Sequence, residues 1–226
     1  EGYDGDDASF TYSVTDEDGE ITTATVTIDI TDIDNTLQDD SQTLGEDKSA
    51  TIDVLDNDSI VDGGTITSLS QPEHGTVVLN DDGTVTYTPD ENYNGTDSFT
   101  YTVTDNDGET QTATVNLTVD PENDTPVAVN DSFSGDEDQA ITFTVNDLLG
   151  NDSDVDNDSL SIAQINGVNL DNIPEEGIDL GNGTLTFDAE SGTFTFTPDQ
   201  DWSGSENLTY IVTDGEGGVA QANIGL

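Results

Sequence analysis

The sequence predicts an all-β protein built from tandem β-sandwich repeats that are joined end to end. Three observations indicate this fold class. Apolar residues alternate with Thr and Ser in short runs such as Phe99-Thr-Tyr-Thr-Val103, which is the pattern of a half-buried strand. Similar segments recur along the chain, and turn residues separate the runs. No segment has convincing helical periodicity.

The repeat is visible as three copies of one strand-and-turn segment. Residues 10–19 align with residues 99–108 and with residues 208–217, because each ends in Val-Thr-Asp and a glycine turn. Upstream signatures also recur: Tyr87-Thr-Pro-Asp90 aligns with Phe196-Thr-Pro-Asp199, and Tyr93-Asn-Gly95 aligns with Trp202-Ser-Gly204. The period is therefore about 90 to 110 residues.

One repeat reads as seven strands that follow one another closely. We expect them near residues 37–44, 49–55, 65–70, 75–80, 84–88, 97–104 and 110–119. They are rich in Thr, Val, Ile, Tyr and Phe, which favour β-structure. Seven short strands in about 100 residues are typical of an immunoglobulin-like sandwich.

The repeat boundaries divide the chain into three parts. Residues 36–122 and 123–226 each form a complete repeat, whereas residues 1–35 hold only the C-terminal hairpin of an incomplete preceding repeat. A lone hairpin is marginally stable in water. We therefore expect the hairpin to be completed either by chain outside the printed sequence or by a strand from a neighbouring molecule.

Charge is the second strong signal. The chain of 226 residues has 51 Asp and Glu side chains against one Lys or Arg, so its formal net charge is −50. Carboxylates at this density repel one another and weaken the compact state. Compensating charge must come from solution, as bound metal or as salt. The same charge excludes nucleic acid and anionic membranes as partners, and no stretch is long and apolar enough for membrane insertion.

Topology predicts where these carboxylates gather. In a seven-stranded sandwich, turns after odd strands lie at one end and turns after even strands at the other. At the boundary between the two complete repeats, we expect three groups of candidate metal ligands to converge. They are Glu46 and Asp47 of the first turn; Asp120, Glu122, Asn123 and Asp124 of the linker; and Asp152, Asp154, Asp156, Asp158, Asp214 and Glu216 of the second complete repeat.

The earlier boundary has a weaker version of this pattern. Its candidates are Asp32, Asp34 and Asn35 in the linker, with Asp56, Asp58, Asp105 and Asp107 facing them. Oxygen ligands in irregular geometry favour Ca²⁺ over Mg²⁺, and the absence of Cys disfavours zinc. An acidic surface adapted to high salt is the alternative, but it would spread acids evenly over the surface.

The run Asp152-Ser-Asp-Val-Asp-Asn-Asp158 is similar to the start of an EF-hand loop. The bidentate Glu that such a loop needs at its twelfth position is missing, because Ala163 stands there. We therefore expect a calcium site on a β-sandwich loop. For a single Asp-Gly pair such as Asp82-Gly83, a plain hairpin turn explains the sequence equally well.

Taken together, these motifs resemble the cadherin-like tandem repeats of large bacterial RTX-type adhesins. The resemblance rests on residues 120–131, on Asp136-Glu-Asp138 and Asn151-Asp152, and on the strand signatures described above. It covers essentially the whole chain. It implies cadherin-like sandwiches, calcium at the linkers, type I secretion by a Gram-negative bacterium, and folding at the cell surface, where the repeats would extend an adhesive tip in adhesion or biofilm formation.

The sequence leaves more than one function open. The chain is either a calcium-rigidified extender or an adhesive module that binds a sugar or a protein, for which Trp202 is the candidate stacking residue. Since Trp202 aligns with Tyr93, a buried corner aromatic is the simpler interpretation. A filament of identical chains, with the hairpin of residues 1–35 completed by strand exchange, is a further alternative. We expect no enzyme, because the single His74 has no counterpart in the other repeat.

Overall fold

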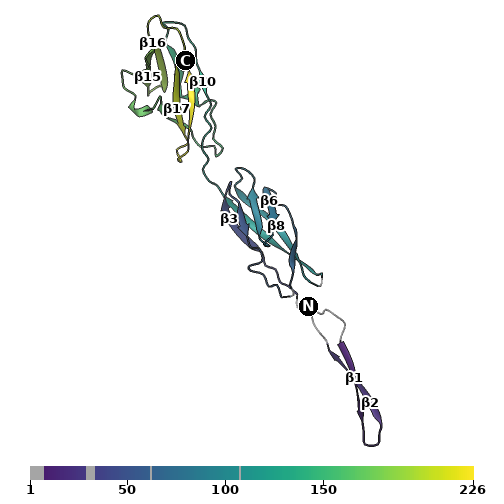
Figure 1. Cartoon of the computed structure of the whole chain (residues 1–226). Coiled ribbons are helices and arrows are strands. Elements are labelled where there is room, and N and C mark those ends of the chain that lie inside the picture. Colours follow the sequence, from purple (N-terminus) through teal and green to yellow (C-terminus); the bar gives the residue numbers. More distant parts are fainter. Residues whose placement is uncertain (1–7, 29–33, 62, 107) are drawn as a thin grey trace. The chain divides into compact units, whose positions relative to one another are not determined.

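The computed structural model describes residues 8–28, 34–61, 63–106 and 108–226. The chain divides into two compact units, residues 1–122 and residues 123–226, which we call unit 1 and unit 2 (Figure 1). The described part of the chain holds no helix with the length and hydrophobicity of a membrane span.

Unit 1 begins with a two-stranded hairpin. Strand β1 (Ala8–Thr15) pairs antiparallel with β2 (Ile21–Ile28) over their whole lengths. The turn between them is closed by Asp16, whose Oδ1 accepts hydrogen bonds from the N–H groups of Asp18 at 3.0 Å and Glu20 at 2.8 Å. This is the hairpin that the repeat alignment predicts.

The remainder of unit 1 is a sandwich of two sheets. One sheet has the order β3-β9-β8-β5 and the other has the order β4-β7-β6. The strands are β3 (Asp40–Gly45), β4 (Ala50–Ile52), β5 (Thr65–Leu69), β6 (Gly75–Leu79), β7 (Val85–Pro89), β8 (Gly95–Thr104) and β9 (Thr110–Asp120). Each falls within a few residues of a predicted strand. The first strand, β3, runs parallel to the last, β9, and all other pairs are antiparallel.

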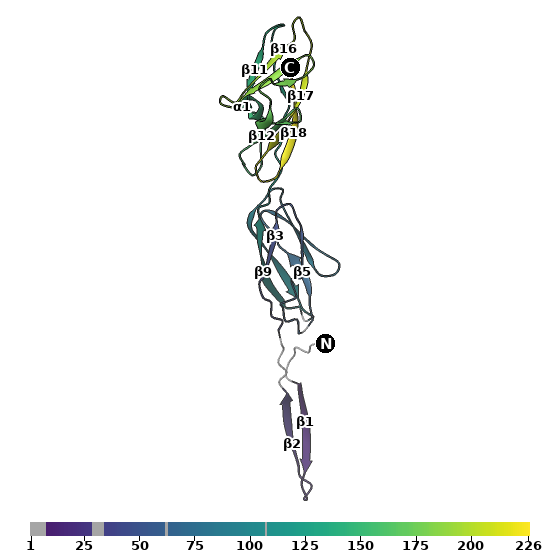
Figure 2. The same ribbon diagram turned by 90° about the vertical axis from the view of Figure 1, so that its left-hand side faces the viewer.

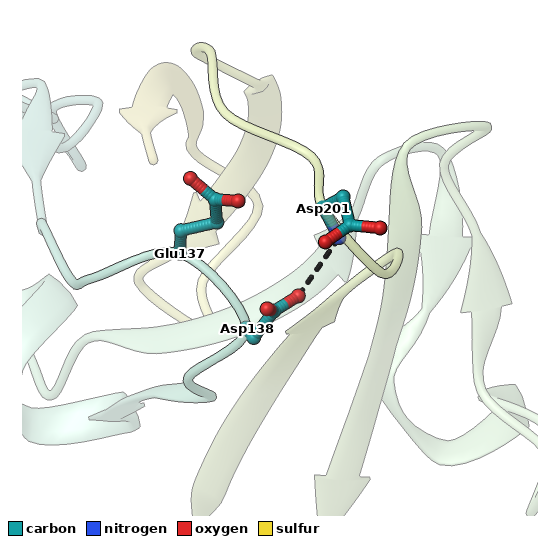
Figure 3. Close-up of side chains that lie close together, drawn as sticks. All are labelled: Glu137, Asp138 and Asp201. Carbon is teal, nitrogen blue, oxygen red and sulfur yellow. Dashed lines mark hydrogen bonds between the residues drawn. The ribbon is translucent and has the colours of Figure 1, made fainter.

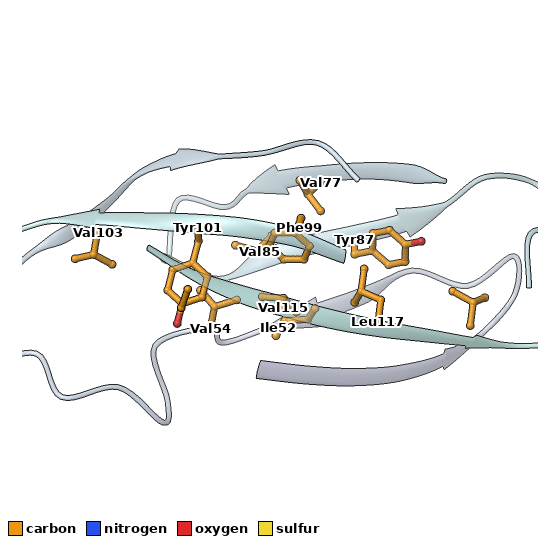
Figure 4. Packing of buried hydrophobic residues seen from close by; sticks show 12 residues of the cluster. Ile52, Val54, Val77, Val85, Tyr87, Phe99, Tyr101, Val103, Val115 and Leu117 are labelled. Carbon is orange, nitrogen blue, oxygen red and sulfur yellow. The ribbon is translucent and has the colours of Figure 1, made fainter. Parts of the chain in front are cut away.

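Alternation along the strands builds the core of unit 1. Phe99, Tyr101 and Val103 of β8 point to one face and are at most 2% exposed, whereas the Thr residues between them face outward. Val85 and Tyr87 of β7 cover them from the opposite sheet (Figure 4). A period of two therefore places every apolar residue of these strands in the core.

Unit 2 repeats this architecture with additions (Figure 2). Its sheets have the orders β10-β18-β17-β12-β13 and β11-β16-β15-β14. Their strands are β10 (Asp131–Ser132), β11 (Ile141–Thr144), β12 (Ser161–Ile165), β13 (Val168–Asn169), β14 (Ile178–Asp179), β15 (Gly183–Asp188), β16 (Thr193–Pro198), β17 (Asn207–Thr213) and β18 (Val219–Gly225). These two sandwiches confirm the predicted all-β class.

Unit 2 also contains short helical segments, which the sequence pattern does not predict. A short helix, α1 (Val145–Leu149), follows β11, and a 3-10 turn, η1 (Leu170–Asn172), follows β13. Helix α1 is set by its cap, because Thr144 Oγ1 accepts from the N–H of Asp147 while the Asp147 carboxylate accepts from the N–H of Thr144. Five residues are too few to produce a helical period in the sequence.

Candidate metal centre

Three carboxylates meet in the loop that leads into β12. Asp154, Asp156 and Asp158 each offer an oxygen, and these oxygens all lie within 4.8 Å of one another. All three side chains are half-buried. The loop is folded around Asp154, whose Oδ1 accepts from the N–H of Asp156 at 2.9 Å and of Asp158 at 3.4 Å. Alternate residues of the run therefore turn their carboxylates toward a common point.

Two further segments of unit 2 join this loop. The N–H of Asp124 donates to Asp156 Oδ2 at 2.8 Å, and the Asn123 side-chain amide donates to Asp214 Oδ2 at 2.9 Å. Asn123 and Asp124 open the unit, and Asp214 stands in the β17–β18 turn. The structure thus brings together three segments of unit 2 whose convergence the topology predicts.

Asp214 also stabilises the β17–β18 turn through hydrogen bonds to its backbone. Its side chain is only 5% exposed, and its Oδ1 accepts from the N–H groups of Glu216 and Gly218 at 2.8 and 3.0 Å. The bond from Asn123 is the main reason that the pKa of the Asp214 carboxyl lies below its ordinary value. Asp16 and Asp105 close the other two hairpin turns in the same way. Part of the signal read as a metal ligand is therefore turn chemistry.

Asp158 has the opposite electrostatic environment. Burial raises the pKa of its carboxyl, and the negative charges of Asp154 and Asp156 raise it further. Glu216 and Asp214 act in the same direction. The only Lys of the chain, Lys48, pairs with Glu122 in unit 1. Unit 2 therefore contains no Lys or Arg that could neutralise these carboxylates.

The donors present fit a calcium ion. Every candidate ligand is an oxygen, which is what Ca²⁺ binds in flexible geometry. Asp154 Oδ2 is buried and has no hydrogen-bond partner, which costs free energy unless a cation or water satisfies it. Gly218 allows the close approach of the segments, because a Cβ there would lie 2.0 Å from Asp214 Oδ2 and 3.1 Å from the Asp124 carbonyl oxygen.

The candidates of unit 1 near its C-terminal end make hydrogen bonds within that unit. Glu46 is 2% exposed and accepts from the N–H of Glu122 at 2.6 Å and from the Asn94 side chain at 3.3 Å. The N–H of Glu46 donates to the carbonyl oxygen of Asp120 at 2.9 Å. Asp47 Oδ1 accepts from the N–H of Asn92. Ion sharing between these residues and unit 2 stays a prediction.

The earlier boundary is built differently. Asn35 is buried, and it bridges a loop by donating to the Gly63 carbonyl oxygen at 2.7 Å and accepting from the N–H of Val61 at 2.9 Å. Asp34 and Asp56 are exposed. Asp32 and Asp107 lie outside the described residues. Within residues 34–61, 63–106 and 108–122, no group of three acids comparable to Asp154, Asp156 and Asp158 forms.

Two of the predicted ligands contact buried tyrosines. Asp58 Oδ2 accepts from the Tyr101 hydroxyl at 2.8 Å, and its Oδ1 accepts from the N–H of Gln38. Asp152 has the same position in unit 2, with the Tyr210 hydroxyl 3.3 Å from its Oδ1. Both tyrosines are fully buried. The Tyr in each copy of the repeat segment was the available signal for this contact, but sequence reasoning assigned it only to the core.

A second acidic group was missed by sequence reasoning. Glu137, Asp138 and Asp201 each offer an oxygen within 4.8 Å of the others, and all are exposed (Figure 3). The N–H of Asp201 donates to Asp138 Oδ1 at 2.8 Å, as Asn92 does to Asp47 in unit 1. The recurrence of Glu-Asp in the first turn of each repeat was the only signal. Because exposed acids often occur together without a metal, we assign no ion here.

The aromatic candidates serve the fold. Trp202 is half-buried and packs edge-to-face on Phe196, with ring centroids 6.0 Å apart. It also lines a cavity of about 210 Å³ together with Ile141 and Pro198. His74 stacks on Tyr93, with ring centroids 4.2 Å apart.

This geometry defines a class: tandem β-sandwiches of the immunoglobulin type with an acidic, oxygen-only loop cluster in unit 2. Comparison with protein families then finds one match in each unit. Residues 33–118 match the bacterial Ig domain, and residues 123–226 match the bacterial cadherin-like domain. Such domains are typically non-catalytic and characteristic of extracellular, adhesin-type surface proteins. The cadherin-like character predicted from the sequence is thereby confirmed for residues 123–226.

Solved structures give more distant matches. The extracellular cadherin domains 1–5 of protocadherin gamma B2 are 15% identical with a TM-score of 0.35, and the alignment covers 97% of this chain and 44% of that one. The endo-fucoidan hydrolase MfFcnA9 of glycoside hydrolase family 107 is 17% identical with a TM-score of 0.28, covering 82% and 32%. The human desmocollin-1 ectodomain is 15% identical with a TM-score of 0.36, covering 95% and 47%. No curated protein matches the chain.

Proposed function

We propose that this chain is a calcium-rigidified extender segment of a large extracellular bacterial adhesin of the RTX type, acting in adhesion or biofilm formation without catalysis. The observation that carries the proposal is the meeting of Asp154, Asp156 and Asp158 in unit 2, with a buried Asp154 oxygen that has no hydrogen-bond partner. The family matches support the extracellular, adhesin-type setting.

Calcium is the ion that suits this group. Several carboxylates a few ångströms apart repel one another by several kcal/mol at intermediate dielectric, at about 4 kcal/mol per pair. A bound Ca²⁺ supplies two positive charges and accepts six to eight oxygens without demanding a regular geometry. Mg²⁺ requires a nearly ideal octahedron and releases its waters reluctantly, so the irregular loop favours calcium.

The chain connection explains how such a site would stiffen a string of repeats. Asn123 and Asp124 hydrogen-bond to Asp214 and Asp156, and they follow Glu122 directly in sequence. On the other side, the N–H of Glu122 is fixed to the buried Glu46 of unit 1. The connecting peptide is therefore tied to both units, and a cation at the acidic loop would immobilise its second half.

Small-angle scattering of the full chain tests the proposal. In calcium, the distribution of particle lengths should be narrow, and chelation should broaden it. The Asp154→Asn, Asp156→Asn double variant should give the broad distribution even in calcium. The matched control is Glu175→Gln with Glu176→Gln, which removes the same two charges from exposed positions in the same unit. Calcium-independent scattering of the unmodified chain would contradict the extender function.

An adhesive module is the second candidate. The cavity beside Trp202 is the observation that favours it, because an aromatic wall with acidic neighbours such as Asp136 and Glu137 can hold a sugar ring. The cavity is smaller than common ligand sites, which have roughly 300 to 1,000 Å³. Binding of glycans that is lost in Trp202→Ala and retained in Tyr93→Ala would favour this function over the extender.

A further inference from the structure

Strand β6 of unit 1 stands at the edge of its sheet. The order β4-β7-β6 gives it one neighbour, β7, so one row of its backbone N–H and C=O groups points away from the sheet. Residues 75–80 carry no charge, and Val78 and Leu79 are 59% and 41% exposed. An uncharged edge strand with exposed apolar side chains is a template for the addition of another strand.

The side chain of Gln71 covers the middle of this edge. Its Nε2 donates to the carbonyl oxygen of Val77, and its Oε1 accepts from the N–H of Val77, both at 3.2 Å. The Val77 side chain itself points into the core (Figure 4). In an antiparallel pair, alternate residues point their N–H and C=O to the same side, so the groups of Gly75 and Leu79 also face this edge. The Gln71 amide therefore supplies the donor and the acceptor that one residue of an added strand would supply.

The loop before β6 is held in place independently of this contact. Pro72, which is buried, follows Gln71 directly. The Asp97 carboxylate of β8 then accepts from the N–H groups of Glu73 at 3.2 Å and His74 at 3.0 Å. Because the loop backbone is already ordered by these contacts, the hydrogen bonds of the amide require only the ordering of the Gln71 side chain.

Unit 2 closes the equivalent edge with a strand. The Thr-Pro signatures of β7 and β16 align, so β15, which pairs with β16, is the counterpart of β6, and Leu185 takes the place of Val77. Strand β14 lies along that edge, with Ile178 opposite Leu185. Its approach is close, because a Cβ at Gly177 would lie 2.7 Å from the Leu185 carbonyl oxygen. The two units therefore close the same edge by different means, a strand in one and a side chain in the other.

A second copy of β6 has the right pattern for the edge that Gln71 covers. Two β6 strands paired antiparallel about Val77 would place Gly75 of each copy opposite Leu79 of the other, in a symmetric pair. The uncharged residues 75–80 would bring no carboxylate into the pair, but Glu73 would face Asp81 just beyond it. Like charges opposite each other weaken strand pairing, and salt screens them. Pairing of two open edges should therefore strengthen with salt.

We propose that the Gln71 amide closes the β6 edge of unit 1 against the addition of β6 from a second copy of the chain. It has the part in unit 1 that strand β14 has in unit 2. This role is independent of calcium and of the extender function, because the hydrogen bonds of Gln71 lie within unit 1 and involve no carboxylate.

Substitution of Gln71 in the full chain tests the closure. Gln71→Ala removes both hydrogen bonds, and sedimentation velocity at high salt should then show a dimer whose association constant exceeds that of the unmodified chain about tenfold or more. Adding Leu79→Pro should abolish the dimer, since proline removes an N–H that faces the edge. The matched control is Gln139→Ala, which removes an exposed amide from a loop of unit 2 and should leave the association unchanged.

Hydrogen exchange of the Val77 amide reports on the edge itself. In Gln71→Ala, this amide should exchange faster than in the unmodified chain at low protein concentration, and more slowly at concentrations where the dimer forms. Gln71→Met keeps the length of the side chain but lacks its donor and acceptor. It repeats both measurements if the alanine variant folds poorly.

Each outcome decides the proposal. A dimer that forms only in the Gln71 variants and disappears with Leu79→Pro supports it. Gln71 variants that stay monomeric at high salt, with a fast-exchanging Val77 amide, would overturn it, because the edge would be open without accepting a strand. A dimer of the unmodified chain that Leu79→Pro abolishes would also overturn it, because the edge would not be closed. A dimer of the variants that survives Leu79→Pro would place the association elsewhere and contradict it as well.

Discussion

The loop between the second and third strands of the sandwich is built in two different ways in the two units. In both units, a linker residue forms an isolated bridge to this loop, Thr36 with Ser59 and Val127 with Ser153. In unit 1, the neutral side chain of Asn35 then closes the loop with hydrogen bonds. In unit 2, carboxylates occupy the loop. The same β-sandwich can therefore hold this loop either with the hydrogen bonds of a neutral amide or with a carboxylate cluster that needs a cation.

The largest expected difference between the two units is the fall in their thermal midpoints when calcium is chelated. At calcium about 100-fold above the dissociation constant, a site contributes about 2.7 kcal/mol, which corresponds to roughly 10–20 °C in the midpoint of a domain of this size. Differential scanning calorimetry should show this drop for unit 2 and little change for unit 1. Equal drops in both units, or equal rescue by sodium chloride, would favour general charge screening over a specific site.

Removing the amide bridge should affect only unit 1. Asn35→Ala leaves the Val61 N–H and the Gly63 carbonyl oxygen without this partner, which costs about 1–3 kcal/mol. Chemical denaturation should show the loss equally with and without calcium. A loss that appears in calcium and vanishes after chelation would mean that Asn35 is a calcium ligand, as the sequence pattern predicts, and would remove the contrast between the two loops.

The stability of unit 1 should depend on pH through the carboxyl of Asp40. Burial and the nearby charge of Asp58 raise the pKa of Asp40 from 3.8 to about 6. The folded state then holds a proton that the unfolded state has lost, so this contribution to stability is present below pH 3.8 and disappears as the pH rises to about 6. In calcium-free buffer, the midpoint of unit 1 should fall across that window. The Asp40→Asn variant should flatten this dependence, and an unchanged pH profile would contradict the account.

The smallest expected effect comes from the close approach at Gly218. In Gly218→Ala, the added methyl group must displace the Asp214 carboxylate, because its position overlaps Oδ2. Calcium affinity should fall several-fold while unit 2 keeps its fold. Titration calorimetry would measure the change. An unchanged affinity would remove Asp214 from the group and restrict the site to the loop of residues 154–158.

The fold was largely predictable because it depends on local alternation. The alternation of Phe99, Tyr101 and Val103 with polar residues predicts a half-buried strand without knowledge of the rest of the fold. Each predicted strand of unit 1 forms close to its expected position. Helix α1 could not be predicted from hydrophobic periodicity, because five residues are too few to show a helical period. Its start is set by the capping box of Thr144 and Asp147. Short segments are governed by such individual hydrogen bonds.

The sequence predicted where the candidate site lies better than it predicted which residues belong to the site. Topology placed Asp156, Asp214 and Asn123 together from remote parts of the sequence. It could not distinguish Asp58 and Asp152, which meet buried tyrosines, from Asp156, because all three are acids in the loop between the second and third strands of a sandwich. Nor could it foresee that Glu46 would be buried against the backbone of Glu122. Such partners depend on packing, which a pattern of residue types does not encode.

Counting bound calcium ions tests the central claim most directly. Titration calorimetry of the metal-free full chain should show at least one ion more in the unmodified protein than in the Asp154→Asn, Asp156→Asn variant. The Glu175→Gln, Glu176→Gln control should match the unmodified protein. The same number of ions and the same affinity in all three proteins would contradict a calcium site at the acidic loop of unit 2.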